Sequence, residues 1–375
     1  MTGERILVTG GAGFIGSHLV DRLVGRGAAV RVLDSLEPQV HGESDVYRNP
    51  AAEYVIGSVL DGDVVKESLV GVTSVVHLAA QVGVGQSMYE MTRYVAENTL
   101  GAAVLLEAAA ECADQLNALV VASSMSIYGE GSYSCLSCEA TGVEVSRPTD
   151  RLTSGKWEPV CSRCGADAVA APTPESKPLE CGSVYAVTKR DHEELALVFG
   201  RAHDVRTVAL RFFNVYGTRQ SLSNPYTGVA AIFSSRLLNN AAPLIFEDGL
   251  QSRDFVHVSD IVRAIDLSLT TESARDVAIN IGTGRATSVL RIAELLSAEL
   301  GVDIQPEILG RFRHGDIRHC FADISRAQQV LGYRPEVELT DGMRELVAWI
   351  QAENPAAKDQ VEAATAELSQ RGLIV

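Results

Sequence analysis

Short apolar segments alternate with helical patterns through the first half of the chain. Residues 5–9 form an apolar run that leads into a glycine-rich turn, and residues 17–25 then carry apolar side chains at helical spacing. Further runs predict strands at 29–34, 53–59, 74–80 and 119–124, and residues 96–113 predict a helix. The strand runs show little alternation of apolar and polar positions, as expected for strands buried on both faces. The pattern predicts an α/β fold, a doubly wound parallel sheet covered by helices.

A stretch rich in Gly, Ser, Pro and Cys, residues 130–178, interrupts this alternation. The regular elements that follow it are predicted as a helix at 184–203, a strand at 206–212, a strand and helix within 254–269, a strand at 278–281 and a helix at 288–300. Residues 356–370 are polar and rich in Ala and Glu, and we expect a peripheral helix there.

Composition narrows the class of protein and its partners. Of the 375 residues, 46% are hydrophobic and 21% are charged, which excludes a mainly disordered chain. No apolar run reaches the roughly 18–20 residues of a membrane-spanning helix, and no secretory signal is recognisable. We therefore expect a cytoplasmic protein without a membrane partner. The formal net charge of −16 repels nucleic acid, so we expect no nucleic-acid partner either.

Gly10, Gly13 and Gly16 recur at every third residue where the first strand meets the first helix. Glycine at this junction permits a tight turn, close approach of the backbone to a pyrophosphate and tight packing of helix on strand. Asp34 ends the second predicted strand, where a carboxylate accepts the ribose hydroxyls of NAD and repels the 2′-phosphate of NADP. These features predict an NAD-binding Rossmann domain. Asp61, after the third strand, is a candidate for contact with the adenine or an exposed loop carboxylate.

A candidate catalytic group combines a phenol, an ammonium and a hydroxyl. Tyr185 and Lys189 are four residues apart and so share one face of the predicted helix. A free tyrosine titrates near 10, and a neighbouring cation lowers the pKa toward the range of a useful base. Ser123 and Ser124 close an earlier strand, where a hydroxyl can bridge the phenol and a substrate oxygen.

These motifs together resemble a known family, the extended short-chain dehydrogenases/reductases that act on nucleotide sugars, and within it the UDP-galactose 4-epimerase type. The matching segments are Thr9–Gly16, His77–Ala80, Ser123–Gly129, Tyr185–Lys189, Arg211–Gly217, Arg253–Val258 and Arg313–Asp316. The resemblance extends to about residue 350. It implies NAD as cofactor, a homodimer, and a nucleotide-diphosphate sugar as substrate, with UDP or dTDP favoured.

The resemblance also implies roles for individual residues. Ser124, Tyr185 and Lys189 correspond to the catalytic triad. The cofactor residues that it adds to the glycines and Asp34 are Phe14, Ile15, Leu78, Ala79, Ala80 and Asn98. At the substrate it implies Ser124, Ser126, Asn214, Arg253 and Arg313, the arginines because guanidinium groups match phosphate oxygens. Taken singly, each arginine is equally consistent with a surface ion pair.

Two departures from the family pattern bear on the reaction. Met125 and Ser126 occupy the positions where the 4,6-dehydratases of this family carry an Asp and a Glu, so elimination of water lacks its general acid. Cys320 stands where the family often has a tyrosine lining the sugar pocket. The smaller side chain leaves room for a larger sugar substituent, or it reflects simple packing.

We therefore predict an isomerase that epimerises a nucleotide-diphosphate sugar at C4 through a transient keto sugar. A nucleotide-sugar ketoreductase or dehydrogenase with net redox change is the alternative. A 4,6-dehydratase and a non-catalytic NAD sensor are less favoured.

The resemblance implies a discontinuous arrangement of domains. We expect residues 1–216 and 254–282 in the NAD-binding domain, with an insertion at 130–180. Residues 217–253 and 283–350 are expected to bind the nucleotide sugar, and 351–375 to form a peripheral tail.

Four of the seven cysteines occur as two Cys-x-x-Cys pairs within the insertion, Cys135 with Cys138 and Cys161 with Cys164. Four thiolates complete the tetrahedral shell of a structural zinc and leave no position open for chemistry. A segment with little core of its own gains stability from such a metal. Disulfides are the alternative, and the expected cytoplasmic location counts against them.

Overall fold

The computed structural model describes residues 3–41, 46–313, 315–353, 359 and 361–374. Its centre is a seven-stranded, wholly parallel sheet with the order β16-β11-β5-β4-β1-β2-β3. The strands are β1 (Arg5–Thr9), β2 (Ala29–Asp34), β3 (Glu53–Ile56), β4 (Ser74–His77), β5 (Ala118–Ser124), β11 (Arg206–Phe212) and β16 (Val277–Ile281). The predicted doubly wound α/β fold is confirmed. Strands β3 and β4 are three residues shorter than predicted, because the chain leaves the sheet at residues 57 and 78 to line a cavity.

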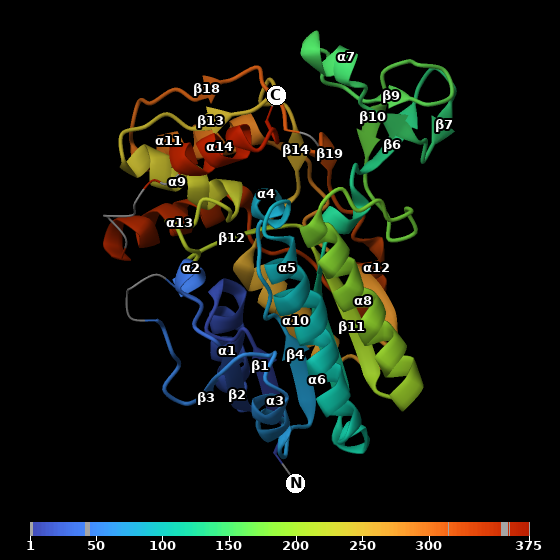
Figure 1. The fold of residues 1–375 in the computed structure, drawn as a ribbon, viewed down its shortest axis with the longest axis vertical. Coiled ribbons are helices and arrows are strands. Elements are labelled where there is room, and N and C mark those ends of the chain that lie inside the picture. The colour runs from blue at the N-terminus through green and yellow to red at the C-terminus, as the bar shows by residue number, and fades with distance from the viewer. Residues whose placement is uncertain (1–2, 42–45, 314, 354–358, 360, 375) are drawn as a thin grey trace.

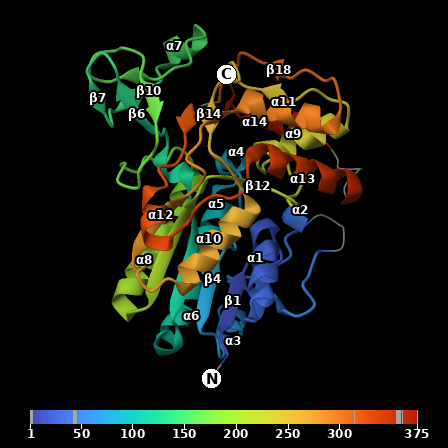
Figure 2. The same ribbon diagram turned by 180° about the vertical axis from the view of Figure 1, so that it is seen from behind.

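Helices cover both faces of the sheet because successive side chains of each strand point to opposite sides. Ile6 and Val8 pack with α1 (Phe14–Gly25) and α10 (Val258–Thr270), whereas Leu7 packs with α3 (Gly62–Leu69), α6 (Gly101–Ala110) and α8 (Val184–His203). Figures 1 and 2 show the molecule from the two opposite sides. Two separate hydrophobic cores therefore hold the sheet in place.

The helix expected at residues 96–113 is composite. A short helix, α5 (Met91–Tyr94), continues into a π-helical turn, η1 (Val95–Leu100), before α6 begins. A 3₁₀ turn, η2 (Ala113–Gln115), follows. π-Helical turns are rare and often occur at functional sites; this one carries Asn98. The remaining short helices near the cavity are α2 (Pro38–His41), α4 (Val84–Ser87) and the 3₁₀ turn η3 (Met125–Tyr128).

A second unit packs beside the carboxyl ends of the central strands. Its helices are α9 (Val229–Leu238), α11 (Val289–Leu300) and α13 (Leu339–Glu353), around their own core that includes Ile292 and Leu346. Its short strands are β13 (Leu244–Ile245), β14 (Ser252–Arg253), β17 (Thr287–Ser288), β18 (Glu307–Ile308) and β19 (His319–Cys320). Strands β12 (Asn214–Tyr216) and β15 (Phe255–His257) pair with each other and contribute side chains to both the main core and this one. Helix α12 (Ser325–Leu331) contacts β16, and α14 (Val361–Gln370) lies near the C-terminus. We propose that residues 1–216 and 254–282 form the NAD-binding domain and that residues 217–253 and 283–350 form the nucleotide-sugar-binding domain. The proposed tail at 351–375 includes residues outside the described part.

The Cys-rich insertion forms a small unit that projects beside the second unit, in green at the upper right of Figure 1. Its strands are β6 (Ser132–Cys135), β7 (Ala140–Thr141), β8 (Val145–Ser146), β9 (Val160–Cys161) and β10 (Val169–Ala171), with the short helix α7 (Thr149–Thr153). Its buried core is limited to Tyr133, Cys135, Val143, Cys161 and Ala168. Among the helices of the described residues, none is long and apolar enough to cross a membrane.

Candidate active site

A cavity of about 430 Å³ opens at the carboxyl ends of the central strands. Strand β1 lies between β4 and β2, so the chain reverses its direction of winding there, which is where open α/β sheets bind ligands. The predicted residues that line the cavity are Gly10, Gly13, Phe14, Ile15, Gly16, Asp34, Leu78, Ala79, Ala80, Ser124, Ser126, Tyr185, Lys189 and Asn214. Those that lie outside its lining are Asp61, Asn98, Arg253, Arg313, Cys320 and the four paired cysteines.

The glycine turn brings the start of α1 against β1. Gly10 has a φ of +69°, and a Cβ added to Gly16 would lie 2.1 Å from the carbonyl oxygen of Gly10. Only glycine fits this contact, which aims the N-terminus of α1 into the cavity. Free N–H groups at a helix N-terminus, together with its dipole, favour a phosphate group.

Asp34 is buried at the end of β2 and lines the same cavity. Burial raises the pKa of Asp34, but hydrogen bonds from His41, Leu36 and Ala12 outweigh it, so the pKa is lowered and the group stays ionised. Asp61 is exposed and does not line the cavity. Its carboxylate caps α3 by accepting from the backbone N–H groups of residues 63 and 64, and residues 57–59 line the cavity instead.

The predicted catalytic side chains meet at the end of β5. Ser183 caps the N-terminus of α8, which directs Tyr185 and Lys189 toward Ser124. Burial raises the pKa of Tyr185 to about 12, against a smaller lowering by a hydrogen bond with Ser124. The ammonium of Lys189 donates to the carbonyl oxygen of Ala122 at 2.9 Å, and burial lowers the pKa of Lys189 to about 7. The phenol therefore needs a nearby positive charge before it acts as a base.

Two histidines form a buried basic cluster with Lys189. His192 Nδ1 lies 3.5 Å from the Lys189 Nζ, and its ring is 4.9 Å from that of His77. Burial, helped by the charge of Lys189, lowers the pKa of His77 to about 3 and that of His192 well below its usual value. Both rings are thus neutral at physiological pH. The sequence analysis did not single out His192, although its spacing of three residues from Lys189 places both on one helix face.

Asn98 supports the site from behind the cavity wall. From the π-helical turn, its side chain accepts from the backbone N–H of Gln81 at 2.7 Å, and donates to the Gln81 carbonyl at 3.1 Å and to Thr188 at 2.9 Å. It therefore ties the cavity-lining segment at residues 79–81 to α8. This is a positioning contact rather than a direct contact with the cavity.

The predicted substrate residues fall into two groups. Ser126 donates to Ser124 Oγ at 3.0 Å and lines the cavity, as does Asn214. Arg253 and Arg313 instead lie together around Asp316, with N···O distances of 3.6 and 3.0 Å. Residue 314, within the matched Arg313–Asp316 motif, lies outside the described residues.

Cys320 is buried beside Thr173, with the sulfur 3.8 Å from its hydroxyl, and burial raises its pKa to about 12. It packs in the main core and does not line the cavity. The structure thus gives Cys320 the packing role that the sequence analysis held as an alternative.

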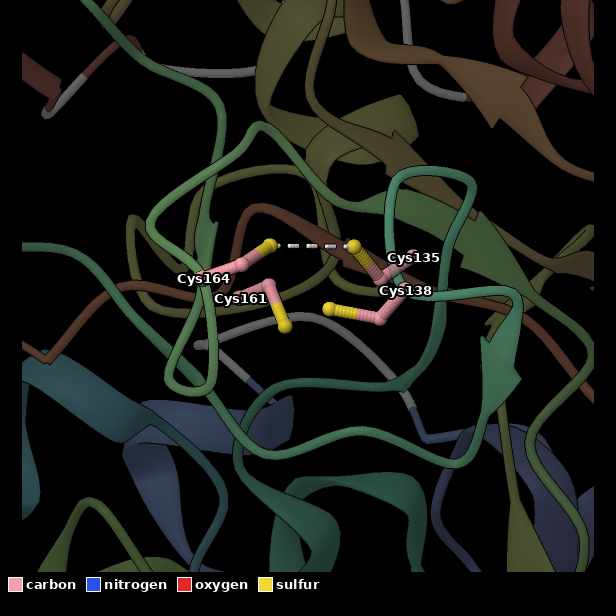
Figure 3. Close-up of side chains that lie close together, drawn as sticks. All are labelled: Cys135, Cys138, Cys161 and Cys164. Atoms are coloured by element: carbon pink, nitrogen blue, oxygen red, sulfur yellow. Dashed lines mark hydrogen bonds between the residues drawn. The ribbon is translucent and has the colours of Figure 1, made fainter.

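The four paired cysteines converge at one point of the insertion (Figure 3). The sulfur atoms of Cys135, Cys138, Cys161 and Cys164 all lie within 4.8 Å of one another. Gly165 follows with a φ of +74°, which lets the chain turn behind the last cysteine. All seven cysteines are free, so the disulfide alternative finds no support.

Comparison with known proteins identifies the family. The NAD dependent epimerase/dehydratase family model matches residues 6–149, and the GDP-mannose 4,6 dehydratase model matches residues 165–346. The dTDP-L-rhamnose 4-epimerase of Burkholderia thailandensis is 34% identical over 358 residues, which cover 94% of this chain and 96% of the relative. The chain belongs to the NAD-dependent epimerase/dehydratase family. The resemblance to nucleotide-sugar short-chain dehydrogenases/reductases is confirmed.

Other members of this epimerase/dehydratase family resemble the chain over nearly its whole length. The UDP-glucose 4-epimerase of Thermotoga maritima, solved with UDP-glucose, is 31% identical with a TM-score of 0.75, covering 93% of this chain and 99% of the other. The UDP-glucuronic acid 4-epimerase of Bacillus cereus, in complex with UDP-glucuronic acid and NAD, is 27% identical with a TM-score of 0.74 and the same coverage. A dTDP-glucose 4,6-dehydratase of an Actinoplanes species is 29% identical, covering 93% of this chain and 98% of the relative.

The buried state of Lys189 predicts a pH dependence of stability. Its pKa is about 7 in the folded chain, against 10.5 as the ordinary value, so between these limits the unfolded chain binds a proton that the folded chain does not. Stability therefore rises with pH in this range. Relative to Lys189→Met, the wild type should gain up to ~4 kcal/mol of unfolding free energy between pH 7 and 10, measured by urea unfolding. Exposed Lys156→Met is the matched control, and equal pH slopes for wild type and Lys189→Met would refute the prediction.

Proposed function

We propose that this protein is an NAD-dependent 4-epimerase of a nucleotide-diphosphate sugar. The observation that carries the proposal is the meeting of Ser124, Tyr185 and Lys189 in the cavity that the glycine turn and Asp34 also line. The 4-epimerases among its relatives support the reaction type and the carbon. The glycine turn and Asp34 would hold NAD, which would supply the acceptor for a hydride from the sugar carbon and the donor for its return to the opposite face.

Each catalytic side chain has a distinct task in this proposal. Tyr185 Oη takes the proton of the C4 hydroxyl and returns it at the end of the cycle. Ser124 hydrogen-bonds the same oxygen and the phenol, which holds both in line. The Lys189 ammonium stabilises the phenolate electrostatically, and the neutral rings of His77 and His192 surround it without adding a competing charge.

The acid–base content of the cavity favours epimerisation over elimination. Met125 and Ser126 both line the cavity next to Ser124, and neither is an acid. Among the lining residues that the structure describes, the carboxyl groups are Asp34, Glu37 and Glu97. Burial and the nearby charge of Glu37 raise the pKa of Glu97, and neither residue lies in the segment that follows Ser124. This argues against a 4,6-dehydratase despite the dehydratase relatives. A ketoreductase with net redox change remains the alternative.

The nucleotide is proposed to be UDP or dTDP, held by Asn214, Arg253 and Arg313. The buried side-chain oxygen of Asn214 has no hydrogen-bond partner in the protein, which suits a residue awaiting a ligand donor. The two arginines supply positive charge despite the net charge of −16.

A homodimer is proposed through η1 and α8. Val95 and Leu100 of η1, and Val187 and Val198 of α8, are exposed by 46% to 56% although apolar. The two elements lie in contact, so their exposed side chains suit a shared apolar face.

We further propose a structural zinc at the four cysteines. Tetrahedral zinc takes four thiolates at distances consistent with sulfur atoms this close together. The ion replaces a hydrophobic core that five buried residues barely provide.

Purified protein without added NAD should convert one member of a panel of UDP-, dTDP-, CDP- and GDP-sugars into a product of unchanged mass. Chromatography coupled to mass spectrometry provides the readout. Loss of 18 mass units, the mass of water, would instead establish a dehydratase. Turnover that depends on added NAD or its reduced form, with a mass change of two hydrogens, would establish the redox alternative.

Tyr185→Phe should abolish turnover, since the variant keeps the ring but loses the group that accepts the proton. NAD binding, followed by fluorescence or calorimetry, should remain within a few-fold of wild type because the glycine turn and Asp34 are unchanged. Turnover above about 1% of wild type in Tyr185→Phe would remove Tyr185 from the mechanism.

Metal analysis should find about one zinc per chain, and Cys161→Ser should lose it. Because the insertion has little core, a strong chelator should lower the melting temperature of the wild type but not that of the variant. Cys112→Ser, at a thiol outside the cluster, should keep both metal and melting temperature. Wild-type protein free of zinc, with melting unchanged by the chelator, would contradict the assignment.

A further inference from the structure

A buried network of charges joins the Cys-rich insertion to the second unit. Arg318, 1% exposed at its side chain, donates to Glu158 of the insertion at 2.6 Å and to Glu247 and Asp248 of the second unit at 2.9 and 2.6 Å. His319 adds a contact of 2.9 Å to Glu158. Figure 1 shows the insertion beside β14 and β19, and His319 is the first residue of β19. Charges are therefore one part of the attachment between the insertion and the second unit. Tyr133 of the insertion's core also contacts the ring of His319, with centroids 6.4 Å apart.

Arg147 of the insertion extends this network to the predicted phosphate arginines. Its side chain is 9% exposed, pairs with Glu247, and donates to the carbonyl oxygen of Asp316 at 3.0 Å. The carboxylate of Asp316 in turn holds both Arg253 and Arg313. One residue thus links the insertion directly to the loop that positions both arginines.

A ring contact reinforces the same link. Trp157 packs edge-on against Phe312, with ring centroids 6.4 Å apart, and Arg147 Nε donates to the Trp157 carbonyl at 3.2 Å. Phe312 directly precedes Arg313. The insertion therefore makes a polar contact with Asp316 and an aromatic contact with Phe312.

The cysteine cluster fixes where Arg147 and Glu158 emerge. Strand β8 pairs with β9 antiparallel, Val145 opposite Cys161 and Ser146 opposite Val160. Arg147 follows β8, and Glu158 precedes β9 by two residues, so both leave the ladder at the same end. Cys161 is one of the four clustered thiols. A metal bound to Cys161 would therefore hold the β8–β9 pair in place, and with it the side chains of Arg147 and Glu158.

Acidic side chains surround the β8–β9 pair, and Arg147 neutralises part of their charge. Glu130, Glu158, Glu247, Asp248 and Asp316 lie within one network. Without Arg147, Glu247 and Glu130 lose a cation, and the field near Arg253 and Arg313 becomes more negative. A doubly charged diphosphate would then bind more weakly.

We propose that the metal-bound insertion is the positioning element of the nucleotide-diphosphate subsite, and that Arg147 and Glu158 are its positioning residues. This inference rests on the proposed function. The insertion thereby increases the affinity for the substrate. The metal holds the β8–β9 pair, from which Arg147 and Glu158 extend. These two side chains contact Asp316, Arg318 and His319, next to Arg313.

The test measures binding of UDP and dTDP by calorimetry to the full-length, metal-loaded protein, with NAD binding measured on the same samples. Arg147→Ala should raise the Kd for the nucleoside diphosphate about tenfold, and chelated wild type should do the same. Glu158→Gln should raise it as well, because losing the ion pairs with Arg318 and His319 releases the adjoining residues, an effect opposite in sign to the loss of one negative charge. The Kd for NAD should stay unchanged, which also shows that the central sheet is folded. Arg151→Ala is the matched control, because Arg151 lies in the same insertion but pairs with the exposed Asp167.

The outcomes separate this inference from the proposed function. Wild-type protein that binds neither UDP nor dTDP would overturn the proposed nucleotide specificity and the inference that rests on it. Binding by wild type with Kd values unchanged in Arg147→Ala, Glu158→Gln and chelated protein would overturn the inference alone. If Arg147→Ala does not fold, Glu158→Gln and chelation decide. An equal loss in Arg151→Ala would show a general effect of the insertion and would also refute the assigned residues.

Discussion

The contact between the turn after β1 and the start of α1 is the constraint on which the cofactor half of the molecule depends. A side chain at Gly16 would collide with the Gly10 carbonyl oxygen, and one at Gly10 would lie 2.7 Å from the backbone nitrogen of Ala79. Three backbone segments therefore meet with no room for a Cβ. This closeness aims the helix N-terminus at the position of a pyrophosphate, and it sets the width of the cavity between β1 and β4. The catalytic group at the end of β5 is useful only because this frame holds a cofactor at a fixed distance from it.

The proposed catalytic group lowers the stability of the folded chain, and contacts elsewhere in the fold must offset this. Burying an ammonium beside two imidazoles is unfavourable, as the lowered pKa values of Lys189, His192 and His77 indicate. The backbone carbonyl of Ala122 and the rigid packing of α8 on β5 hold Lys189 there nonetheless. Lys189 is poorly solvated there, and the pKa of the nearby Tyr185 is itself raised by burial to about 12. In the proposed mechanism, this buried ammonium is the charge that stabilises the phenolate of Tyr185.

Sequence patterns predicted the elements that are determined by local signals, such as hydrophobic periodicity and short motifs. Helix α8 and strand β11 have the predicted bounds, and the glycine turn, Asp34, Ser124, Tyr185 and Lys189 line one cavity. Features that depend on packing were not predicted. Nothing local marks the π-helical turn around Asn98. The helix-capping role of Asp61 was not predicted either, because the alternatives considered for it were adenine contact and an exposed loop carboxylate. The ion network joins Glu158 to Arg318 across 160 residues, a separation at which no periodicity carries information.

The charge of the molecule explains why a substrate subsite should depend on an insertion. A chain with a net charge of −16 repels a nucleoside diphosphate at long range, so binding requires a local surplus of cations. The second unit contributes Arg253, Arg313 and Arg318, but Glu247, Asp248 and Asp316 draw on the same guanidinium groups. Arg147 of the insertion forms an ion pair with Glu247, and so neutralises one of these carboxylates. A segment that brings only one arginine and one glutamate to this contact needs a rigid base rather than a large core, and four thiolates around one ion supply rigidity with few residues. In this proposal, the cysteine cluster acts through where it places two charged side chains, and a metal bound there takes no part in the reaction.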